Sequence, residues 1–274
     1  MSFNRYVRYY LIISLVAMIS GGCSGKLSPK VRQQKADHFA VVGNLVHERI
    51  STDNFLLTTY QRFNHKHKSK QLVVYIEGDG MAWISRNQLS TNPTPVHPVA
   101  LELASLDKDA NILYVARPCQ YLWPQPMSHC SSDYWNYKRG SEEVISAINQ
   151  VISIIKAREG FLSIKLIGYS GGGGIAALIT DRRDDVERLI TVAGNLNYQM
   201  FTKIHKLTPL NGSIDPIIVA KKIETVDQVH YTGGKDKVIP KQIAHSFSDK
   251  VIVVKDATHN NWGEVLSKLL EFWN

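Results

Sequence analysis

The stretch that most constrains this chain is residues 166–174, which read LIGYSGGGG. Four consecutive glycines follow a short apolar run, and this pattern fits three kinds of turn between a strand and a helix. The turn can cradle the phosphates of a nucleotide, form part of a dinucleotide-binding unit, or present a serine at a sharp bend. Each alternative predicts a different protein, so the neighbouring residues have to separate them.

The residues around the glycines argue against both nucleotide alternatives. A phosphate loop requires G-x-x-x-x-G-K-[ST], but Ile175 and Ala176 follow the glycines here, where no lysine occurs. A dinucleotide turn is matched in letters by Gly171, Gly173 and Ala176. That turn also requires an acidic residue at the end of the next strand to hold a ribose, and residues 191–195, TVAGN, contain none. The serine bend therefore explains the stretch best.

The pentapeptide GYSGG, residues 168–172, matches the pattern G-x-S-x-G. In this elbow the serine takes a strained backbone conformation, and small flanking residues prevent the turn from colliding with its neighbours. An apolar, strand-like run precedes the pentapeptide, and the helical pattern GIAALIT follows it. This context predicts Ser170 as a nucleophile at the end of a strand.

The rest of the chain alternates strand-like and helical patterns. With 274 residues, 44% of them hydrophobic, it has the size of one large domain. We expect strands near residues 38–43, 55–63, 72–78, 111–118, 163–169, 188–194, 228–234 and 250–256, the first two as an opening pair. Helices are expected at 96–106, 141–159 (capped by Ser141), 172–180, 241–247 and 261–273, with an irregular region at 195–227. This alternation predicts a mostly parallel sheet covered by helices, with ligand chemistry at the carboxyl ends of its strands.

A serine hydroxyl needs a base, and the base needs an acid that orients it. Asp236 lies just past the strand expected at 228–234, and His259 lies just past the strand expected at 250–256. Because parallel strands end at the same edge of a sheet, we expect both side chains to meet Ser170.

Other carboxylates and imidazoles suit these roles less well. Asp215 lies in an irregular segment before any strand, and Asp256 precedes His259 too closely. His230 falls inside a strand and His245 within a helix, whereas a histidine that must reach the serine belongs on a loop.

From about residue 38 to residue 274, the chain resembles the α/β-hydrolase superfamily. The likeness lies in the elbow GYSGG, the loop GGKDKVIP and the loop DATHNNW, in the order serine, acid, histidine. The resemblance implies the α/β-hydrolase fold, a mostly parallel sheet of about eight strands with helices on both faces. It also implies the roles of nucleophile, acid and base for Ser170, Asp236 and His259.

The resemblance further implies an oxyanion hole, in which two N–H donors stabilise the charge that develops on the reacting carbonyl. One donor is the backbone N–H of Gly171. The other is expected in the loop YIEGDGMAW, where we choose Asp79 or Gly80. Relatives often carry a His-Gly pair in that loop, and this sequence has Glu77 and Gly78 instead.

The N-terminus carries a targeting pattern. Residues 1–22 resemble a bacterial lipoprotein signal peptide, with a basic start, the apolar run LIISLVAMI and small residues before Cys23. The resemblance implies lipidation of Cys23 and hence a membrane-anchored protein of the bacterial cell envelope. An ordinary secretory signal is the alternative. Residues 23–37 are expected to form a polar tether in front of the hydrolase domain, residues 38–274.

Two further cysteines, Cys119 and Cys130, lie eleven residues apart in a loop rich in Pro and Trp. In an oxidising compartment we expect them to form a disulfide, and the alternative is two separate buried thiols. The aromatic residues of this loop, residues 117–135, then either form an apolar wall over the site or only cover the sheet.

The net charge of +8 comes from 32 Lys and Arg against 24 Asp and Glu, and the basic residues are spread along the chain. No nucleic-acid recognition motif accompanies them, so we expect a solvated basic surface and no nucleic-acid partner. His65 and His67 are flanked by lysines, which favours a solvated turn over a metal site. No metal and no organic cofactor is expected.

These patterns predict a serine hydrolase that cleaves carboxylic esters, lipid esters among them, through an acyl-enzyme. Thioesterases and peptidases use the same three side chains, and the sequence does not separate them from esterases. Only 33 residues, 195–227, separate the sixth and seventh expected strands, which excludes a large helical lid and favours an accessible pocket. The alternative function belongs to a different class: an envelope lipoprotein that binds a ligand without turnover. In that case Ser170 is only a small residue in a tight turn.

Overall fold

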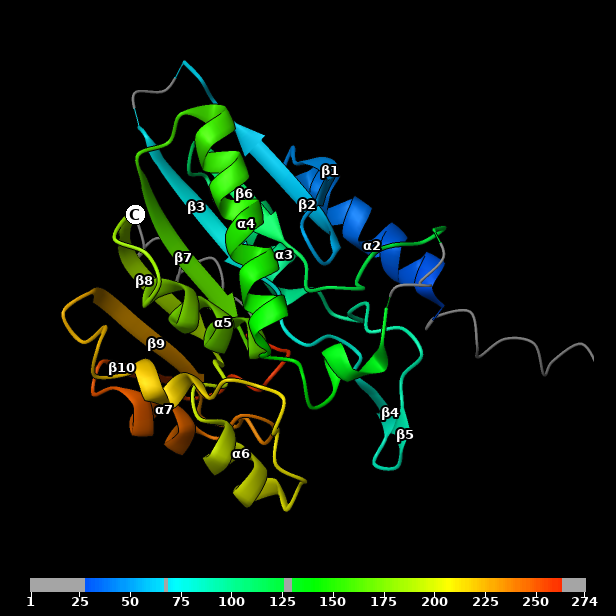
Figure 1. Ribbon diagram of the computed structural model, residues 1–274, viewed down its shortest axis with the longest axis vertical. Helices are drawn as coiled ribbons and strands as arrows, with labels where there is room; N and C mark the ends of the chain where they lie inside the picture. The colour runs from blue at the N-terminus through cyan, green and yellow to red at the C-terminus, as the bar shows by residue number, and fades with distance from the viewer. Residues whose placement is uncertain (1–27, 67–68, 126–129, 263–274) are drawn as a thin grey trace, which may run out of the picture.

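The computed structural model describes residues 28–66, 69–125 and 130–262 (Figure 1). Its centre is an eight-stranded sheet in the order β1-β2-β6-β3-β7-β8-β9-β10. β1 pairs with β2, and β2 with β6, in antiparallel fashion; all later pairs are parallel. The strands are β1 (Val46–Ser51), β2 (Leu56–Phe63), β3 (Gln71–Ile76), β6 (Asn111–Val115), β7 (Ser163–Tyr169), β8 (Val186–Val192), β9 (Asp227–Gly233) and β10 (Val251–Val254).

Helices cover both faces of this sheet because its central strands bury alternate side chains on opposite sides. In β3, Leu72, Val74 and Ile76 join one core cluster, whereas Val73 and Tyr75 join the other. The first cluster packs under α4 (Glu142–Glu159), α5 (Gly171–Thr180) and α7 (Lys241–Phe247), and the second under α2 (Pro29–Val42) and α3 (Val99–Leu106). In Figure 1, α4 and α5 cross the front of the sheet. The predicted fold class is confirmed.

The remaining elements are short and lie near the carboxyl ends of the strands. A two-stranded hairpin consists of β4 (Trp83–Ser85) and β5 (Gln88–Leu89), and two 3-10 turns are η2 (Ser132–Trp135) and η3 (Pro216–Val219). The region expected to be irregular contains α6 (Tyr198–His205) as well as η3. Within the three described ranges, no helix has the length and apolar character needed to cross a membrane.

Helix α2 corrects two expectations about the N-terminal part. Residues 38–43 were expected as a strand and residues 29–37 as part of a tether, but a helix covers residues 29–42 and Gly43 is its C-cap. Ser28 caps it with its side chain and Pro29 occupies its first turn, which is a helix-start signal. The helix is part of the domain because four of its side chains are buried: Arg32, Gln33, Ala36 and Ala40.

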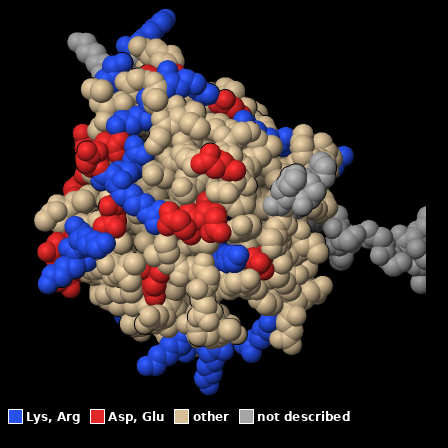
Figure 2. All heavy atoms as spheres, in the orientation of Figure 1, with Lys and Arg blue, Asp and Glu red and all other residues tan. Residues whose placement is uncertain are grey.

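Several other expectations about the ends of elements and of the chain have different outcomes. Ser141 stands at the N-cap position of α4, but its side chain makes no capping hydrogen bond. The signal peptide with Cys23, and the closing helix from residue 263 onward, lie outside the described residues. On the face seen in Figure 2, Lys and Arg alternate with Asp and Glu over the middle of the molecule, and Lys and Arg project along its lower edge.

Candidate active site

Ser170 lies at the sharp turn between β7 and α5. Its backbone has φ 52 and ψ −121, a conformation that side-chain-bearing residues rarely adopt. The turn is fixed by its backbone: the Ser170 N–H donates to the Val192 carbonyl at 3.0 Å, and the Ser170 carbonyl accepts from Asn195 N–H at 2.9 Å. A Cβ at Gly172 would lie 2.3 Å from the Ile76 carbonyl, so only glycine fits there. Close packing against β3 therefore explains Gly172, and Gly173 and Gly174 also lie close to Gly194 and Asn195 in the loop after β8.

Two later loops bring a histidine and an acid to this serine. The Ser170 Oγ lies 3.1 Å from His259 Nε2, and His259 Nδ1 lies 2.9 Å from Asp236 Oδ2. Asp236 follows β9 and His259 follows β10, so the carboxyl ends of neighbouring parallel strands place all three side chains at one edge. The structure thus brings the three residues singled out from the sequence into one hydrogen-bonded series.

Further hydrogen bonds hold Asp236 and the loop that carries His259 in place. The other carboxylate oxygen of Asp236 accepts the N–H groups of Val238 at 2.8 Å and Ile239 at 2.9 Å. The His259 carbonyl accepts from the Tyr169 hydroxyl and from the Trp262 indole, both at 3.0 Å. Sequence reasoning passed over Tyr169 and Trp262, because nothing in their spacing shows that they fasten the histidine loop.

The rival residues occupy unrelated places. Asp215 accepts N–H groups at the starts of η3 and α6, and Asp256 pairs with Lys235 on the surface. His230 lies fully buried in β9 between Thr191 and Gln228, and burial lowers its pKa to about 4. His245 belongs to α7.

The loop after β3, residues 77–80, forms the opposite wall of the site. The Asp79 carboxylate lies so close to Gly171 that a Cβ there would meet it at 2.2 Å. Arg117 Nη1 contacts this carboxylate at 3.1 Å and Arg139 Nη1 at 2.9 Å, and the three side chains are nearly buried. Two cations thus face one carboxylate beside the nucleophile, and no sequence pattern singled out either arginine.

The N–H groups of the same loop differ in their partners. Gly78 N–H donates to Glu77 Oε1 at 3.0 Å. Across the described ranges, no hydrogen bond takes up the N–H of Asp79 or that of Gly80. Gly80 has φ +68, and its Cα faces the Pro93 carbonyl, whereas Asp79 lies directly against Gly171.

Glu77 is a buried carboxyl group next to this loop. Burial raises its pKa to about 7, in spite of the hydrogen bonds that it accepts from Gly78 N–H and the Tyr114 hydroxyl. It stands where relatives often carry the histidine of a His-Gly pair. Its role here is to hold the loop through its hydrogen bonds.

A cavity of about 360 Å³ opens above Ser170 and His259. Its polar lining includes Asp79, Arg139 and Asn195. Its apolar lining comes from four separate parts of the chain: Met81, Ala82, Trp83, Pro95, Val96, Phe201, Val238 and Ile239. The dimensions suit a small apolar group next to the serine.

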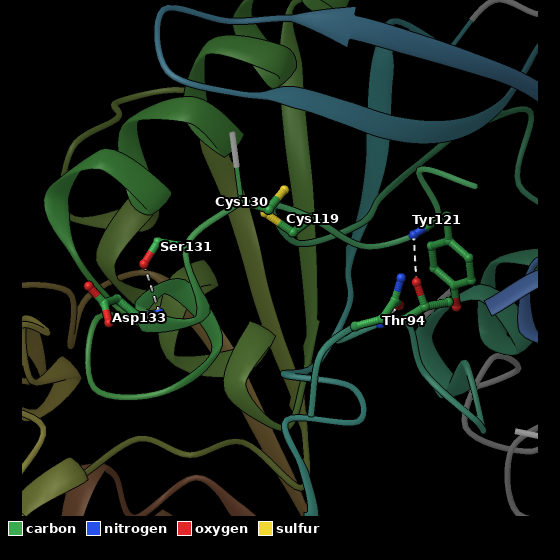
Figure 3. Close-up of a disulfide and its surroundings, with 7 residues drawn as sticks. Thr94, Cys119, Tyr121, Cys130, Ser131 and Asp133 are labelled. Carbon is green, nitrogen blue, oxygen red and sulfur yellow. Dashed lines mark hydrogen bonds between the residues drawn. A yellow bond between two sulfur atoms is a disulfide. The ribbon is translucent and has the colours of Figure 1, made fainter. Parts of the chain in front are cut away.

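The described residues of the aromatic loop, 117–125 and 130–135, take no part in this lining. The structure joins Cys119 and Cys130 in a disulfide, which Figure 3 shows beside the chain leading to Tyr121. Tyr121 is fully buried in the core cluster of α2 and α3, and the Trp135 indole donates to the Ser90 carbonyl at 2.9 Å. Of the two expectations for these described aromatics, the structure supports the one in which they cover the core.

Comparison with known proteins gives a likeness at the level of structure. No family model matches the sequence, and no curated protein matches it. Among solved structures, Est1E from Butyrivibrio proteoclasticus superposes with a TM-score of 0.61 at 14% identity, over 83% of this chain and 96% of that one. An alpha-beta serine hydrolase homologue from Coxiella burnetii gives 0.55 at 16% identity, over 83% and 94%.

The chain has the α/β-hydrolase fold. A third similar structure is a membrane phospholipase A, described as a bacterial virulence factor, with a TM-score of 0.51 at 13% identity over 97% of both chains. At these identities the likeness concerns the fold, and the chemistry has to be argued from the site itself. Among the described residues, no group of three or more His, Cys, Asp or Glu is arranged to hold a metal.

Proposed function

We propose that this chain is a serine hydrolase that cleaves carboxylic esters, with Ser170 as nucleophile, His259 as base and Asp236 as orienting acid. The observation that carries the proposal is the series from Ser170 Oγ to His259 Nε2, at 3.1 Å, and from His259 Nδ1 to Asp236 Oδ2, at 2.9 Å. Both distances lie within reach of proton transfer and of a strong orienting hydrogen bond.

In the first half-reaction, Ser170 Oγ forms a bond to the ester carbonyl carbon while its proton passes to His259 Nε2. The tetrahedral intermediate then expels the alcohol, which takes the proton from His259, and leaves the acyl group on Ser170. A water molecule repeats the sequence: it gives a proton to His259 and attacks the acyl carbon, and the acid leaves as the serine regains its proton. Asp236 keeps Nδ1 protonated and stabilises the imidazolium.

The intermediate carries its negative charge on the former carbonyl oxygen, which needs N–H donors. We assign Gly171 N–H, at the start of α5, and Asp79 N–H, with Gly80 N–H as the second choice for the loop. The Asp79 carboxylate beside this position would repel the oxyanion, but Arg117 and Arg139 both contact it. The cluster has a formal charge of +1, which favours the intermediate.

The cavity and the fold neighbours together support the proposed substrate class. The apolar lining, which comes from four parts of the chain, suits an acyl chain or an aromatic acyl group. The neighbours include Est1E and a membrane phospholipase A. We therefore propose carboxylic esters, with lipid esters among them, for a lipoprotein anchored in a bacterial envelope through Cys23.

A fluorophosphonate probe tests the proposal, because it reacts with a serine only when that serine is activated. We expect the chain to be labelled, and labelling to disappear in Ser170→Ala and in His259→Ala. Circular dichroism of each variant establishes that the fold is intact. A folded wild-type chain that resists the probe would contradict the proposal and favour a binding lipoprotein without turnover.

A panel of p-nitrophenyl esters of increasing chain length, with a thioester and a peptide anilide beside it, defines the bond that is cleaved. The proposal predicts that kcat/KM is highest for the oxygen esters. Higher kcat/KM for the thioester or the anilide would keep the three catalytic roles and replace the substrate class.

A further inference from the structure

Three segments that are distant in sequence each contribute an apolar side chain to the lining of the cavity. Trp83 of the β4–β5 hairpin, Phe201 of α6 and Val238 of the loop after β9 all line the cavity. The His205 Nε2 lies 2.8 Å from the Val238 carbonyl, which joins the end of α6 to that loop. We call residues 83–88, 203–208 and 235–241 the rim.

The rim exposes large apolar side chains from all three segments. Trp83, Ile84, Ile204, Leu207 and Val238 are each between 42% and 51% exposed. A single exposed apolar residue is ordinary, but five around one opening form a surface that is suited to a partner. Trp83 and Val238 line the cavity itself, and Ile84, Ile204 and Leu207 belong to the segments that adjoin it, so the partner would lie where the substrate enters.

The same rim is strongly basic. Its exposed cations are Arg86, Lys203, Lys206, Lys235, Lys237 and Lys241. Its one acidic residue is Asp236, whose carboxylate is buried against His259. The rim therefore carries six Lys and Arg against one acid, whereas the whole chain carries 32 against 24.

Most of these cations lack an acidic partner. Lys235 pairs with Asp256 at 2.7 Å, and across the described ranges the other five rim cations form no ion pair. In Figure 1 the β4–β5 hairpin and α6 both extend from the lower end of the molecule, and in Figure 2 Lys and Arg project along that edge. The rim is thus directed to one side, away from the helix-covered faces.

We propose that the rim docks on a lipid surface that carries anionic headgroups. The apolar side chains would enter the boundary between headgroups and acyl chains, and the lysines and Arg86 would lie among the phosphates. A lipid surface fits better than a protein partner because protein interfaces are depleted in lysine at their centres. The docking is independent of catalysis; its consequence, that Ser170 faces lipid esters, rests on the proposed function.

Vesicle sedimentation with the full chain tests the docking, since any contribution of the N-terminal segment is the same in every variant. The triple variant Arg86→Gln/Lys203→Gln/Lys206→Gln removes three rim cations. The matched control Lys66→Gln/Lys70→Gln/Lys108→Gln removes three exposed cations near the amino ends of the strands. Phosphatidylglycerol vesicles and phosphatidylcholine vesicles provide the two surfaces.

We expect the rim variant to partition about 100-fold more weakly than wild type onto phosphatidylglycerol, at roughly fivefold per cation, and the control to change little. A second variant, Ile84→Ser/Leu207→Ser, weakens the binding that remains at high salt, where charge is screened. Equal losses in the rim and control variants, unchanged partition of the rim variant, or equal wild-type binding to both vesicle types would each overturn the proposal. Absence of wild-type binding to either vesicle would overturn it in favour of a protein partner.

The readouts separate this inference from the proposed function. Fluorophosphonate labelling and hydrolysis of a soluble short-chain ester do not require a surface, so both rim variants keep them. If wild type resists the probe while vesicle binding still depends on the rim, the function fails and the docking stands. If labelling persists while vesicle binding is unaffected by the rim variants, the docking fails and the function stands.

Discussion

Two walls of the site are built in different ways. The elbow wall, residues 168–174 with Ser170, is set by backbone contacts so close that glycine is required. The loop wall, residues 77–80, is held by ionisable side chains. Glu77 is a buried carboxyl group, and Asp79 is contacted by Arg117 and Arg139, which lie 38 and 60 residues away in the sequence. The first wall can be recognised in a sequence because it is local, and the second cannot because its parts meet only in the folded chain.

The largest expected effect on kcat comes from Asp236, the acid that orients His259 next to Ser170 of the elbow wall. Asp236→Asn keeps an oxygen for the N–H groups of Val238 and Ile239, but it no longer holds the histidine in the correct tautomer. We expect kcat to fall by about 10⁴ without loss of fold, as measured on a soluble ester. Asp215→Asn, at the rival carboxylate, is the matched control and should leave kcat within twofold of wild type.

The steric character of the elbow wall is tested by stability. Gly172→Ala would place a Cβ 2.3 Å from the Ile76 carbonyl, and we expect the free energy of unfolding to fall by about 3 kcal/mol in urea titration. Gly160→Ala provides the comparison, because Gly160 has φ +72 but no atom near its added Cβ. It should cost about 1 kcal/mol, from backbone strain alone. Equal losses at the two sites would mean that conformation, and not close packing, explains the glycines.

The pH dependence of the free energy of unfolding tests the role of ionisable groups in the loop wall. Burial raises the pKa of Glu77 to about 7, above its ordinary value of 4.5, so the folded chain binds this proton more tightly than the unfolded chain. Its contribution is fully present below pH 4.5 and is lost as the pH rises to 7, which lowers the free energy of unfolding by about 3 kcal/mol. Glu77→Gln removes that dependence, and the difference between the two pH profiles measures it. Parallel profiles would show that the carboxyl group is ionised throughout.

The smallest effect concerns the two arginines. Arg139→Gln leaves Asp79 with one cation and loosens the loop, so we expect kcat to fall about tenfold while KM changes little. A boronic acid, which imitates the tetrahedral intermediate, should lose a similar factor in affinity, whereas a substrate-like amide should not. Equal losses for the two ligands would assign Arg139 to substrate binding and separate it from the oxyanion hole.

The features that could be predicted from the sequence are those that depend on local patterns, and the features that could not are those that depend on contacts between distant residues. The pentapeptide at Ser170 and the positions of Asp236 and His259 just past two strands are local patterns, and they predicted where these residues lie. Strands β2, β3 and β7 were also located, because their apolar runs are bounded by turn residues.

The errors have physical reasons as well. Residues 38–43 are rich in β-branched and aromatic residues, but burial of Ala36 and Ala40 against the sheet made them the end of α2. One of the two expectations for the aromatic loop 117–135 placed it as an apolar wall over the site, because that loop is long and rich in aromatic residues. Tyr121 is instead buried in the core, and the apolar lining comes from four short segments whose spacing in the sequence does not show that they meet.

The loop after β9 contains both the proposed orienting acid, Asp236, and a rim residue, Val238, within three positions. Asp236 anchors the imidazole there, and Val238, two residues on, is among the outermost side chains beside the entrance. The amide that fastens the carboxylate belongs to that same exposed valine. A contact that displaces Val238 at the surface therefore also displaces the N–H that holds the Asp236 carboxylate, and with it the hydrogen bond that orients His259. Binding at the outer surface of this turn is thus coupled to the geometry of the buried site.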